Sequence, residues 1–490
     1  MPFRKFMGIC IILLCAFPLI SAADTTPDES SLQTTGRHSV RIDGKSIDYT
    51  SVTGTLPIRD TKGVQDAWIF YIAYTRDGVS DMDDRPILFS FNGGPGSSSV
   101  WMHMAFIGPR KVVYDRAGFM LPPPYSLADN EHSILDVADL VFIDPVGTGY
   151  SRMLPGKPIH KYHGVMEDIR SVAEFIRLYV TRHDRWGSPK YIIGESYGTT
   201  RASGLTGWLL SAHRMYTNGT ILVSMTGLGG DRGADMSYAT ILPHFAATAW
   251  YHKALPPDLQ NRPLREVLDE AETFAMGEYS TALLRGGWLP DADKKIIAEK
   301  TARLTGLPVD YVLQSNLRVD RARFRKELLR SRGLTVGRLD SRYTGIDGDD
   351  AGEAIEFDPA MAHWSGPFTG AVHRYFKQEL GISTDIPYNV FGSVHPWKGR
   401  RDVDVGEMLR RAMHENSFLR VLVLEGYYDG ACDYFGAQYT MSHLDLTGKL
   451  ADRISFAFFE SGHMMYIHQP SLAQARRELV KFIRPAEPER

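Results

Sequence analysis

The apolar positions of this chain change their spacing along its length, and each spacing predicts a different kind of element. Between residues 38 and 75, apolar and polar side chains alternate in short runs, which is typical of antiparallel strands. Compact apolar runs at residues 86–91, 139–144 and 191–193 indicate buried strands, whereas residues 167–180 carry apolar side chains at helical intervals. Strands that alternate with helices predict an α/β fold with a central, mostly parallel sheet.

A different pattern occupies the middle of the chain, from residue 231 to residue 370. Its apolar residues fall at helical spacing, and we expect three helices there, near residues 264–275, 291–304 and 309–332. The strand pattern then returns at residues 420–425 and 454–459, and a last helix is expected over residues 470–484. We therefore predict one α/β core and one helical cap insertion, formed by residues 24–230 with 371–490 and by residues 231–370.

The first 23 residues have the features of a secretory signal peptide. Arg4 and Lys5 precede an apolar run from Met7 to Ile20, and residues 21–23 supply the small side chains that a signal peptidase needs. An uncleaved membrane anchor is the alternative. Residues 24–36 are polar and rich in Ser and Thr, so we expect a disordered leader there.

Composition excludes several classes of protein. The 490 residues include 55 basic and 58 acidic side chains, with 43% hydrophobic and 23% charged residues. These ordinary globular values exclude a disordered chain, a collagen-like repeat and a coiled coil, and the balanced charge offers no basic surface for nucleic acid.

Cysteine usage bears on the compartment. Cys10 and Cys15 would leave with the signal peptide, so Cys432 would be the only cysteine of the mature chain and no internal disulfide could form. An exported chain without disulfides favours a bacterial periplasmic or secreted protein over a eukaryotic secretory one. No membrane association is expected after cleavage of the signal.

Gly194-Glu195-Ser196-Tyr197-Gly198 lies between the strand at 191–193 and a helix of small residues that follows. A tight strand-to-helix turn exposes its serine, and the N-terminus of the helix favours developing negative charge. The same short pattern also occurs in plain turns, but its position between a strand and a helix favours a nucleophilic Ser196.

Asn92-Gly93-Gly94-Pro95-Gly96 follows the predicted strand that ends at Phe91. Acyl transfer needs backbone N–H groups that point at the oxygen of a tetrahedral intermediate. We expect the N–H groups of Gly94 and Tyr197 to form this oxyanion hole, and an ordinary tight turn is the alternative.

A serine nucleophile needs a base, and the base needs a carboxylate that orients it. Asp429 follows the strand predicted at 420–425, and His463 follows the strand predicted at 454–459. The order Ser196, Asp429, His463 is the order of the catalytic residues in α/β-hydrolases. The sequence therefore predicts a Ser-Asp-His triad. It shows neither a HExxH motif nor paired cysteines, so we expect no metal and no cofactor.

These motifs make the chain resemble the serine carboxypeptidases, the family that includes carboxypeptidase Y and cathepsin A. The matching segments occur in the order of that family, and they are residues 92–99, 144–151, 194–198, 426–432 and 462–464. The resemblance implies an α/β-hydrolase fold with a helical cap. It also implies a serine-type carboxypeptidase that releases C-terminal residues from peptides with a free C-terminus.

The resemblance further implies that Asn92, Glu195 and the Gly93 N–H bind the C-terminal carboxylate of the substrate. A glutamate beside another carboxylate tends to hold a proton, because two like charges at short range do not both stay ionised. The family pairs this glutamate with a second one, but Phe106 stands at that place here. The carboxylate site is thus incomplete or is partnered from elsewhere, and we expect Glu195 to be less easily protonated than in relatives and the pH profile to move toward neutral pH.

Two other departures from the family pattern concern cysteine. Ser97 stands where the family has a cysteine in the oxyanion loop, so the disulfide of that loop is missing. Cys432 matches a family cysteine that is free and lines the substrate pocket.

Two other functions remain as alternatives. The departure at Phe106 is compatible with an esterase or an acyltransferase on the same scaffold, and a binding protein without catalysis is the third reading, disfavoured because all triad positions are filled. The side-chain preference of the enzyme and its oligomeric state do not follow from the sequence.

Overall fold

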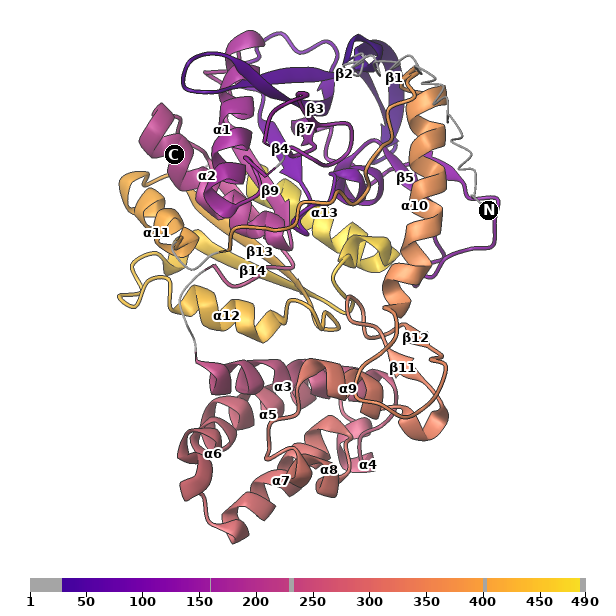
Figure 1. Cartoon of the computed structure of the whole chain (residues 1–490), viewed down its shortest axis with the longest axis vertical. Coiled ribbons are helices and arrows are strands. Elements are labelled where there is room, and N and C mark those ends of the chain that lie inside the picture. Colours follow the sequence, from indigo (N-terminus) through magenta and orange to yellow (C-terminus); the bar gives the residue numbers. More distant parts are fainter. Residues whose placement is uncertain (1–28, 159, 229–232, 400–402, 485–490) are drawn as a thin grey trace, which may run out of the picture.

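The computed structural model describes residues 29–158, 160–228, 233–399 and 403–484. The predicted signal peptide at residues 1–23 lies outside the described residues. Within the described part, the chain forms a sheet-containing part and a helical lobe, which lie one above the other in Figure 1.

A ten-stranded sheet runs through the larger part, in the order β1-β2-β3-β7-β4-β9-β10-β13-β14, with β8 paired to β3. The edge strands are antiparallel, and their bounds are Thr34–Ile42 (β1), Lys45–Arg59 (β2), Gln65–Arg76 (β3) and Arg152–Met153 (β8). From β7 onward, neighbouring strands are parallel, and their bounds are Asp139–Ile143 (β7), Ile87–Phe91 (β4), Lys190–Glu195 (β9), Gly219–Val223 (β10), Arg420–Gly426 (β13) and Ile454–Phe459 (β14).

The central parallel strands are mostly apolar because helices cover both faces of the sheet. All residues of β4, β7, β9 and β10 are buried. On β9, Tyr191 and Ile193 pack in one hydrophobic cluster and Ile192 packs in the other, as the alternation of a strand requires. The expected α/β-hydrolase-like sheet is thus confirmed, including its antiparallel edge.

One face of the sheet is covered by three helices: Val165–Arg182 (α1), Tyr197–His213 (α2) and Val405–Glu415 (α11). The other face is covered by Pro359–Gln378 (α10), Gln469–Ile483 (α13) and a π-helical turn at Met102–Ile107 (η2). Tyr434–Ser442 (α12) lies beside the lobe, and two short strand pairs, Arg110–Val112 (β5) with Leu127–Asp129 (β6) and Thr335–Val336 (β11) with Thr344–Gly345 (β12), complete this part.

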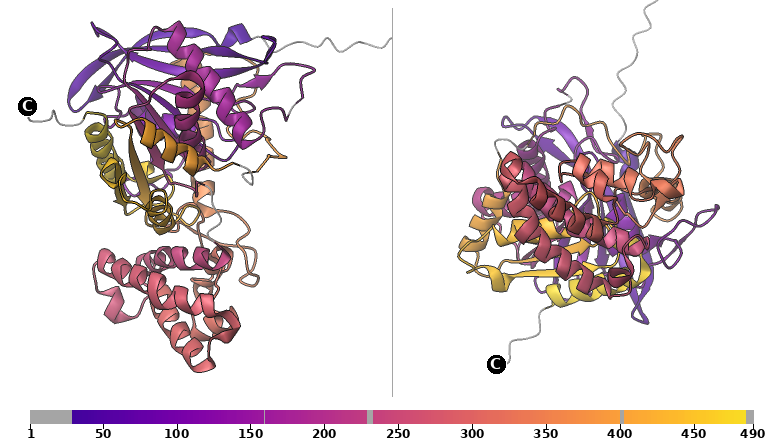
Figure 2. Two further views of the ribbon diagram at one scale, coloured as in Figure 1. Left: turned by 90° about the vertical axis from the view of Figure 1, so that its left-hand side faces the viewer. Right: turned by 90° about the horizontal axis from the view of Figure 1, so that it is seen from below.

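The helical lobe has its own hydrophobic cluster and hangs below the sheet-containing part in Figures 1 and 2. Phe245 and Phe324 stack in this cluster with ring centroids 3.8 Å apart, and Tyr428 and Tyr434 of the larger part join it. The helices of the lobe are Ala234–Tyr251 (α3), Pro257–Gln260 (α4), Leu264–Phe274 (α5), Ser280–Arg285 (α6), Asp291–Thr305 (α7), Val309–Gln314 (α8) and Arg321–Glu327 (α9). Short turns complete it and the rest of the chain: Glu29–Leu32 (η1), Ala275–Tyr279 (η3), Gly286–Trp288 (η4), Arg330–Arg332 (η5), Ala451–Arg453 (η6) and Met465–Ile467 (η7).

Three details differ from the expectations. The helix expected over 309–332 is broken, because Asn316 and Leu317 adopt positive φ angles and the Asp320 side chain caps a new helix. Residues 29–36 are not a disordered leader, because Leu32 is fully buried and β1 begins at Thr34. The expected boundary at residue 370 falls inside α10. The buried side chains of α10 pack on the sheet, so the hydrophobic packing places the end of the lobe before α10. Otherwise, the division into 24–230, 231–370 and 371–490 stays a prediction.

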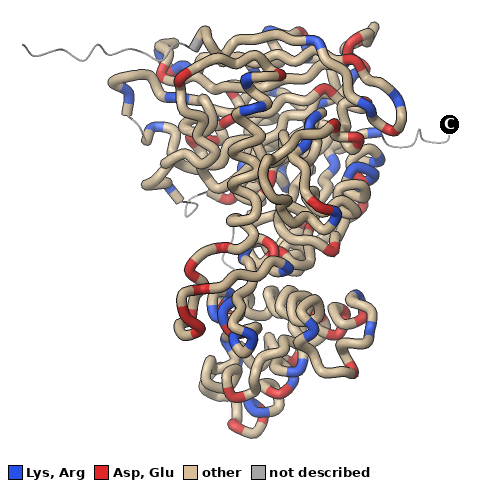
Figure 3. Tube along the Cα trace, turned by 90° about the vertical axis from the view of Figure 1, so that its right-hand side faces the viewer, with Lys and Arg blue, Asp and Glu red and all other residues tan. Residues whose placement is uncertain are grey.

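Charged residues of both signs are interspersed over both parts of the molecule in Figure 3. Among the described residues, no helix combines the length and the apolar character that are needed to span a membrane.

Candidate active site

Ser196 lies in a strained turn between β9 and α2. Its backbone has φ 58° and ψ −127°, a left-handed conformation that is costly for a residue with a Cβ. The Ser196 N–H donates to the Val223 carbonyl, 2.9 Å away at the end of β10. The side chain is partly exposed although its neighbours on both sides are buried. This geometry is that of a nucleophile elbow.

Asp429 and His463 form a buried pair beyond the ends of β13 and β14. The His463 Nδ1 lies 2.6 Å from Asp429 Oδ2, and Asp429 is fully buried. The other carboxylate oxygen of Asp429 accepts the N–H groups of Ala431 and Cys432 at 2.8 and 2.9 Å. Because the ionised carboxylate only accepts hydrogen bonds, Nδ1 carries the proton and Nε2 is the ring nitrogen left to act as a base.

Two sets of contacts tie the turn of Ser196 to the loop of His463. Ser196 is bonded to Val223, and the next residue, Ser224, donates its hydroxyl to the His463 carbonyl at 2.7 Å. Three residues after His463, Tyr466 donates its hydroxyl to Glu195, which directly precedes Ser196. The structure therefore brings the three predicted triad segments to one edge of the sheet.

The charge state of His463 depends on two opposing effects. Burial lowers the pKa of His463, but the carboxylate of Asp429 attracts and hydrogen-bonds the protonated ring, and the net direction of the pKa is well above the ordinary value. Asp429 thus stabilises the imidazolium that forms when a base takes a proton.

The glycine loop of residues 92–96, the predicted oxyanion loop, packs directly on the turn of Ser196. A Cβ on Gly93 would lie 2.5 Å from the Tyr197 nitrogen and 2.6 Å from the Glu195 oxygen, so only glycine fits there. Arg201 of α2 also holds this loop in place, because its guanidinium donates to the Asn92 carbonyl at 2.7 Å. The same guanidinium donates to the Asp168 carboxylate at 2.8 Å. Gly94 follows Gly93 in this loop, which places its N–H and that of Tyr197 on adjoining segments.

Glu195 is the buried carboxyl group beside Ser196, and both of its oxygens accept hydrogen bonds. Asn92 Nδ2 donates to Oε2, and the Tyr466 hydroxyl donates to Oε1 at 2.6 Å. Burial raises the pKa of Glu195, while the positive charge of His463 and the hydrogen bonds from Tyr466 and Asn92 lower it. The net direction is upward, so Glu195 is more easily protonated than a free glutamate; the comparison with relatives stays a prediction.

Phe106 supplies no group that contacts Glu195 directly. Its ring stacks on Tyr466 with centroids 4.9 Å apart and an interplanar angle of 10°. Of the two possibilities that the sequence left open, the structure supports a partner from elsewhere, because the Tyr466 hydroxyl donates to Glu195 Oε1 at 2.6 Å.

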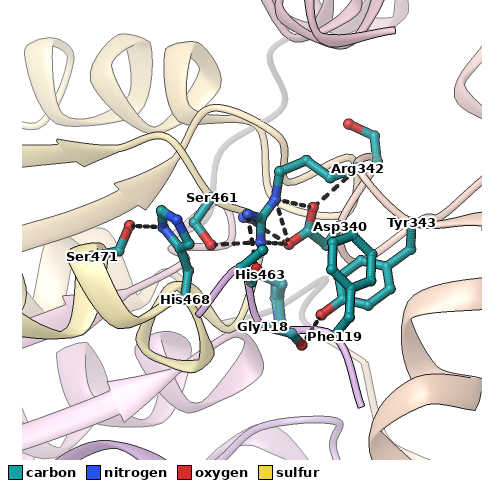
Figure 4. A network of polar contacts seen from close by, with 12 residues as sticks. Gly118, Phe119, Asp340, Arg342, Tyr343, Ser461, His463, His468 and Ser471 are labelled. Atoms are coloured by element: carbon teal, nitrogen blue, oxygen red, sulfur yellow. Dashed lines mark hydrogen bonds and ion pairs between the residues drawn. The ribbon is translucent and has the colours of Figure 1, made fainter. Parts of the chain in front are cut away.

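Residues 339–343 support the loop of His463 from the side of the helical lobe (Figure 4). The His463 N–H donates to the Leu339 carbonyl at 2.7 Å, and the Gly462 N–H donates to Asp340 at 3.1 Å. Arg342 forms a buried ion pair with Asp340 at 2.6 Å and also donates to the Ser461 hydroxyl at 3.1 Å. The position of the histidine therefore depends on a segment far from it in sequence.

The ligand atoms of Asp429, Cys432 and His463 lie within 4.8 Å of one another, which is a spacing that could hold a metal ion. The His463 nitrogen that faces this group is already bonded to Asp429 at 2.6 Å, and burial raises the pKa of Cys432, which disfavours the thiolate that metals prefer. These residues fit a hydrogen-bonded catalytic pair better than a metal site.

Comparison with known proteins places part of this chain in one family. Residues 44–225 match a family model described as serine carboxypeptidase. The serine carboxypeptidase-like 29 protein of Arabidopsis thaliana is 31% identical over 133 residues, which is 26% of this chain and 25% of that protein. The pheromone-processing carboxypeptidase KEX1 of Saccharomyces cerevisiae is 33% identical over 155 residues, 29% of this chain and 20% of that protein. Over residues 44–225 the chain is thus similar to the serine carboxypeptidases.

The fold of the chain also resembles a solved structure over most of its length. The crystal structure of the prohormone-processing carboxypeptidase Kex1 from Saccharomyces cerevisiae matches it with a TM-score of 0.57 at 14% identity, over 93% of this chain and 95% of that one. At that identity the match describes the fold alone. The sequence matches span only about a quarter or less of the curated relatives, and the matched family segment contains Ser196 but neither Asp429 nor His463.

The sequence did not reveal four of the residues that support the candidate site: Arg201, Tyr466, Asp340 and Arg342. Arg201 is a charged residue within a helix of small and apolar residues, and it is only 1% exposed. A charge in that position is a signal for a buried partner. Tyr466, Asp340 and Arg342 contact the site only because of the tertiary fold, and no local pattern marks them.

Proposed function

We propose that the chain is a serine-type carboxypeptidase that releases C-terminal residues from peptides by acyl-enzyme chemistry. The observation that carries the proposal is a buried His463–Asp429 pair tied to a strained, partly exposed Ser196, with Glu195 and Asn92 beside it. The family match supports the same reaction class.

The reaction begins when Ser196 Oγ attacks the carbonyl carbon of the last peptide bond. His463 Nε2 takes the hydroxyl proton, and Asp429 stabilises the resulting imidazolium through Nδ1. The carbonyl oxygen becomes an oxyanion, to which the N–H groups of Gly94 and Tyr197 donate. When the intermediate collapses, His463 gives its proton to the leaving amine, and the peptide remains as an ester on Ser196. Water then repeats the two steps and frees the enzyme.

The substrate carboxylate is bound by Asn92, the Gly93 N–H and a protonated Glu195. Each of these groups offers a hydrogen to the carboxylate, and the raised pKa of Glu195 favours the protonated form. Recognition of the terminal carboxylate places only the last peptide bond at Ser196, so one residue leaves in each cycle.

A serine-directed fluorophosphonate probe tests the nucleophile. We expect the probe to label the full chain and the label to be lost in Ser196→Ala, with a loss of kcat of about 10⁴-fold or more. Ser203→Ala is the matched control, because Ser203 lies on the same helix and its buried hydroxyl has no hydrogen-bond partner among the residues that the structure describes. Labelling that persists in Ser196→Ala would contradict the proposal.

An esterase or acyltransferase is the second candidate, and the observation that favours it is Phe106, which leaves Glu195 without a second carboxyl group. Peptides that differ only in a free or amidated C-terminus separate the two. A carboxypeptidase prefers the free acid, whereas equal cleavage of both peptides favours the esterase.

We further propose that the chain is exported to the periplasm or secreted, because residues 1–23 have a signal-peptide pattern. The N-terminus of the protein recovered from an expressing host should then be Asp24. A recovered chain that retains residues 1–23 would contradict this.

A further inference from the structure

We infer that Tyr466 is a specificity-determining residue, which sets the pH range over which a substrate with a free C-terminal carboxylate is accepted. The inference rests on the proposed function, since it concerns the group that would bind this carboxylate. It is carried by the direct contact between the Tyr466 hydroxyl and Glu195, which lie 271 positions apart in the sequence.

Both oxygens of Glu195 are held by hydrogen-bond donors. The amide nitrogen of Asn92 carries hydrogens only, and its own Oδ1 accepts the Met102 N–H at 3.1 Å, which fixes the orientation of the amide. Tyr466 donates to the opposite oxygen at 2.6 Å. Two donors stabilise the ionised form of a carboxyl group.

Tyr466 acts differently from a second carboxyl group. Two carboxyl groups at this distance would share a proton, and the pair would resist complete ionisation. Burial and the charge of Glu195 raise the pKa of Tyr466 well above its ordinary value, so the phenol keeps its proton and does not titrate with Glu195. Within the described part of the chain, neither side chain that is hydrogen-bonded to Glu195 is a carboxyl group, so Glu195 would titrate alone in the proposed carboxylate-binding site.

The tyrosine is held in place tightly enough to act as a fixed donor. Its side chain is fully buried, and the ring of Phe106 stacks on it nearly parallel. Tyr466 also lies in a short helical turn only three residues after His463. The same loop thus carries the proposed base and the donor to Glu195.

The other groups that face Glu195 determine the direction of the effect. Burial and the negative charge of Asp429 raise the pKa of Glu195, whereas His463, Tyr466 and Asn92 lower it. Loss of the Tyr466 hydroxyl removes a donor to the ionised form, so the pKa of Glu195 must rise further.

The ionisation of Glu195 affects substrates differently according to their C-terminal group. A protonated Glu195 donates to a terminal carboxylate, but an ionised Glu195 repels it. A terminal amide carries no charge and is not repelled. The ratio of kcat/KM for a free-acid peptide to that for its amide should therefore fall as Glu195 ionises, and any dependence on His463 cancels in the ratio because both peptides need the same base.

The test measures this ratio from about pH 4 to pH 8 for the full chain and for Tyr466→Phe. We expect the midpoint of the fall to move upward by about one pH unit in Tyr466→Phe, because a hydrogen bond to a charged group is worth roughly that much. Tyr191→Phe is the matched control, since Tyr191 is a buried tyrosine of β9 whose hydroxyl donates to the Ile483 carbonyl at 3.1 Å, away from Glu195. Its midpoint should equal that of the unaltered chain.

A second variant identifies the titrating group. In Glu195→Gln the ratio should become independent of pH, because the amide cannot ionise. A midpoint that is unchanged or lowered in Tyr466→Phe, or a ratio that still titrates in Glu195→Gln, overturns the inference.

If Tyr466→Phe does not fold, Phe106→Leu carries the test. It keeps the hydroxyl but removes the ring that holds it, so a smaller upward shift is expected and an unchanged midpoint overturns the inference. Failure of the proposed function gives a different result from failure of this inference. In that case the unaltered chain would release no terminal residue from the free-acid peptide at any pH.

Discussion

At the scale of single residues, burial raises the pKa of three carboxyl groups in the sheet-containing part of the molecule. Glu195, Glu425 and Asp144 are each at most 4% exposed, and burial raises the pKa of all three. Glu425 bonds the Met225 N–H through one oxygen, and its other oxygen has no partner among the described residues. Burial therefore shifts these three groups toward the protonated form, and a donor such as Tyr466 opposes that shift at Glu195.

The raised pKa of Asp144 can be tested through the pH dependence of the free energy of unfolding. Asp144 binds the N–H and the hydroxyl of Ser99, just beyond the oxyanion loop, and burial raises its pKa from 3.8 to about 6. A raised pKa means that the folded chain binds more protons than the unfolded chain between these values, so the Asp144 contribution to stability falls as the pH rises from about 4 to 6.

The stability of Asp144→Asn relative to the unaltered chain should therefore increase over that pH range, by at most roughly 3 kcal/mol. Urea unfolding at several pH values measures the difference. A difference that stays constant with pH would contradict the assignment.

At the scale of elements, the segment of residues 339–343 joins the helical lobe to the loops that carry Asp429 and His463. Ser341 bonds Thr248 and His252 of the lobe side through its hydroxyl and its carbonyl, and its N–H donates to the Tyr428 carbonyl at 2.9 Å. Asp340 meanwhile accepts the Gly462 N–H beside His463. The segment is thus bonded to α3, to the loop of Asp429 and to the loop of His463.

Gly462→Ala should disturb this junction without touching a triad side chain. A Cβ on Gly462 would lie 2.4 Å from the Cβ and Cγ atoms of Asp340, so the loop of His463 must move. A displacement of about 1 Å can cost on the order of 100-fold in rate, and we expect kcat to fall by about that factor.

Gly277→Ala is the matched control, because a Cβ at Gly277 in the lobe meets no atom within 4 Å. Its kcat should be unchanged. Full activity in Gly462→Ala would show that His463 does not depend on its contact with Asp340.

At the scale of the whole molecule, hydrophobic packing holds the two parts together. The helical lobe has its own cluster, and Tyr428 and Tyr434 of the larger part are built into it. Cys432 is the one cysteine within the described residues, and it is free and buried. The stability of the folded part should therefore come from its core and not from covalent links.

Reducing agent should consequently leave the thermal stability unchanged. We expect the same Tm with and without dithiothreitol, measured by differential scanning calorimetry on the purified chain. A lower Tm in reductant would mean that a disulfide, within the chain or between two copies, contributes to stability.

The sequence predicted the features that local patterns encode. The nucleophile turn, the glycine loop and the strands around them follow from apolar runs that end in turn residues, and the structure has them at β4, β7, β9, β13 and β14. It missed β10, a five-residue strand that follows α2 closely, and it did not anticipate the break before α9, although Asp320 is a recognisable N-cap.

The partner of Glu195 could not be predicted for a physical reason. A contact between a strand end and a turn 271 positions later depends on how the whole sheet is assembled, and Tyr466 lies in no motif. The same holds for Asp340 and Arg342, whose role depends on where the chain returns from the lobe. Sequence patterns predicted the candidate triad, and the tertiary structure was needed to find the groups that hold it.

The segment of residues 339–343 has a consequence for protein engineering. A chimaera could receive the helical lobe of another protein to alter substrate choice. It must keep residues 339–343 of the original chain, because Leu339 is hydrogen-bonded to the backbone of His463 and Asp340 to that of Gly462. The second crossover point should therefore be placed before residue 339. The graft then replaces the helices of the lobe and keeps the hydrogen bonds that hold the loop of His463.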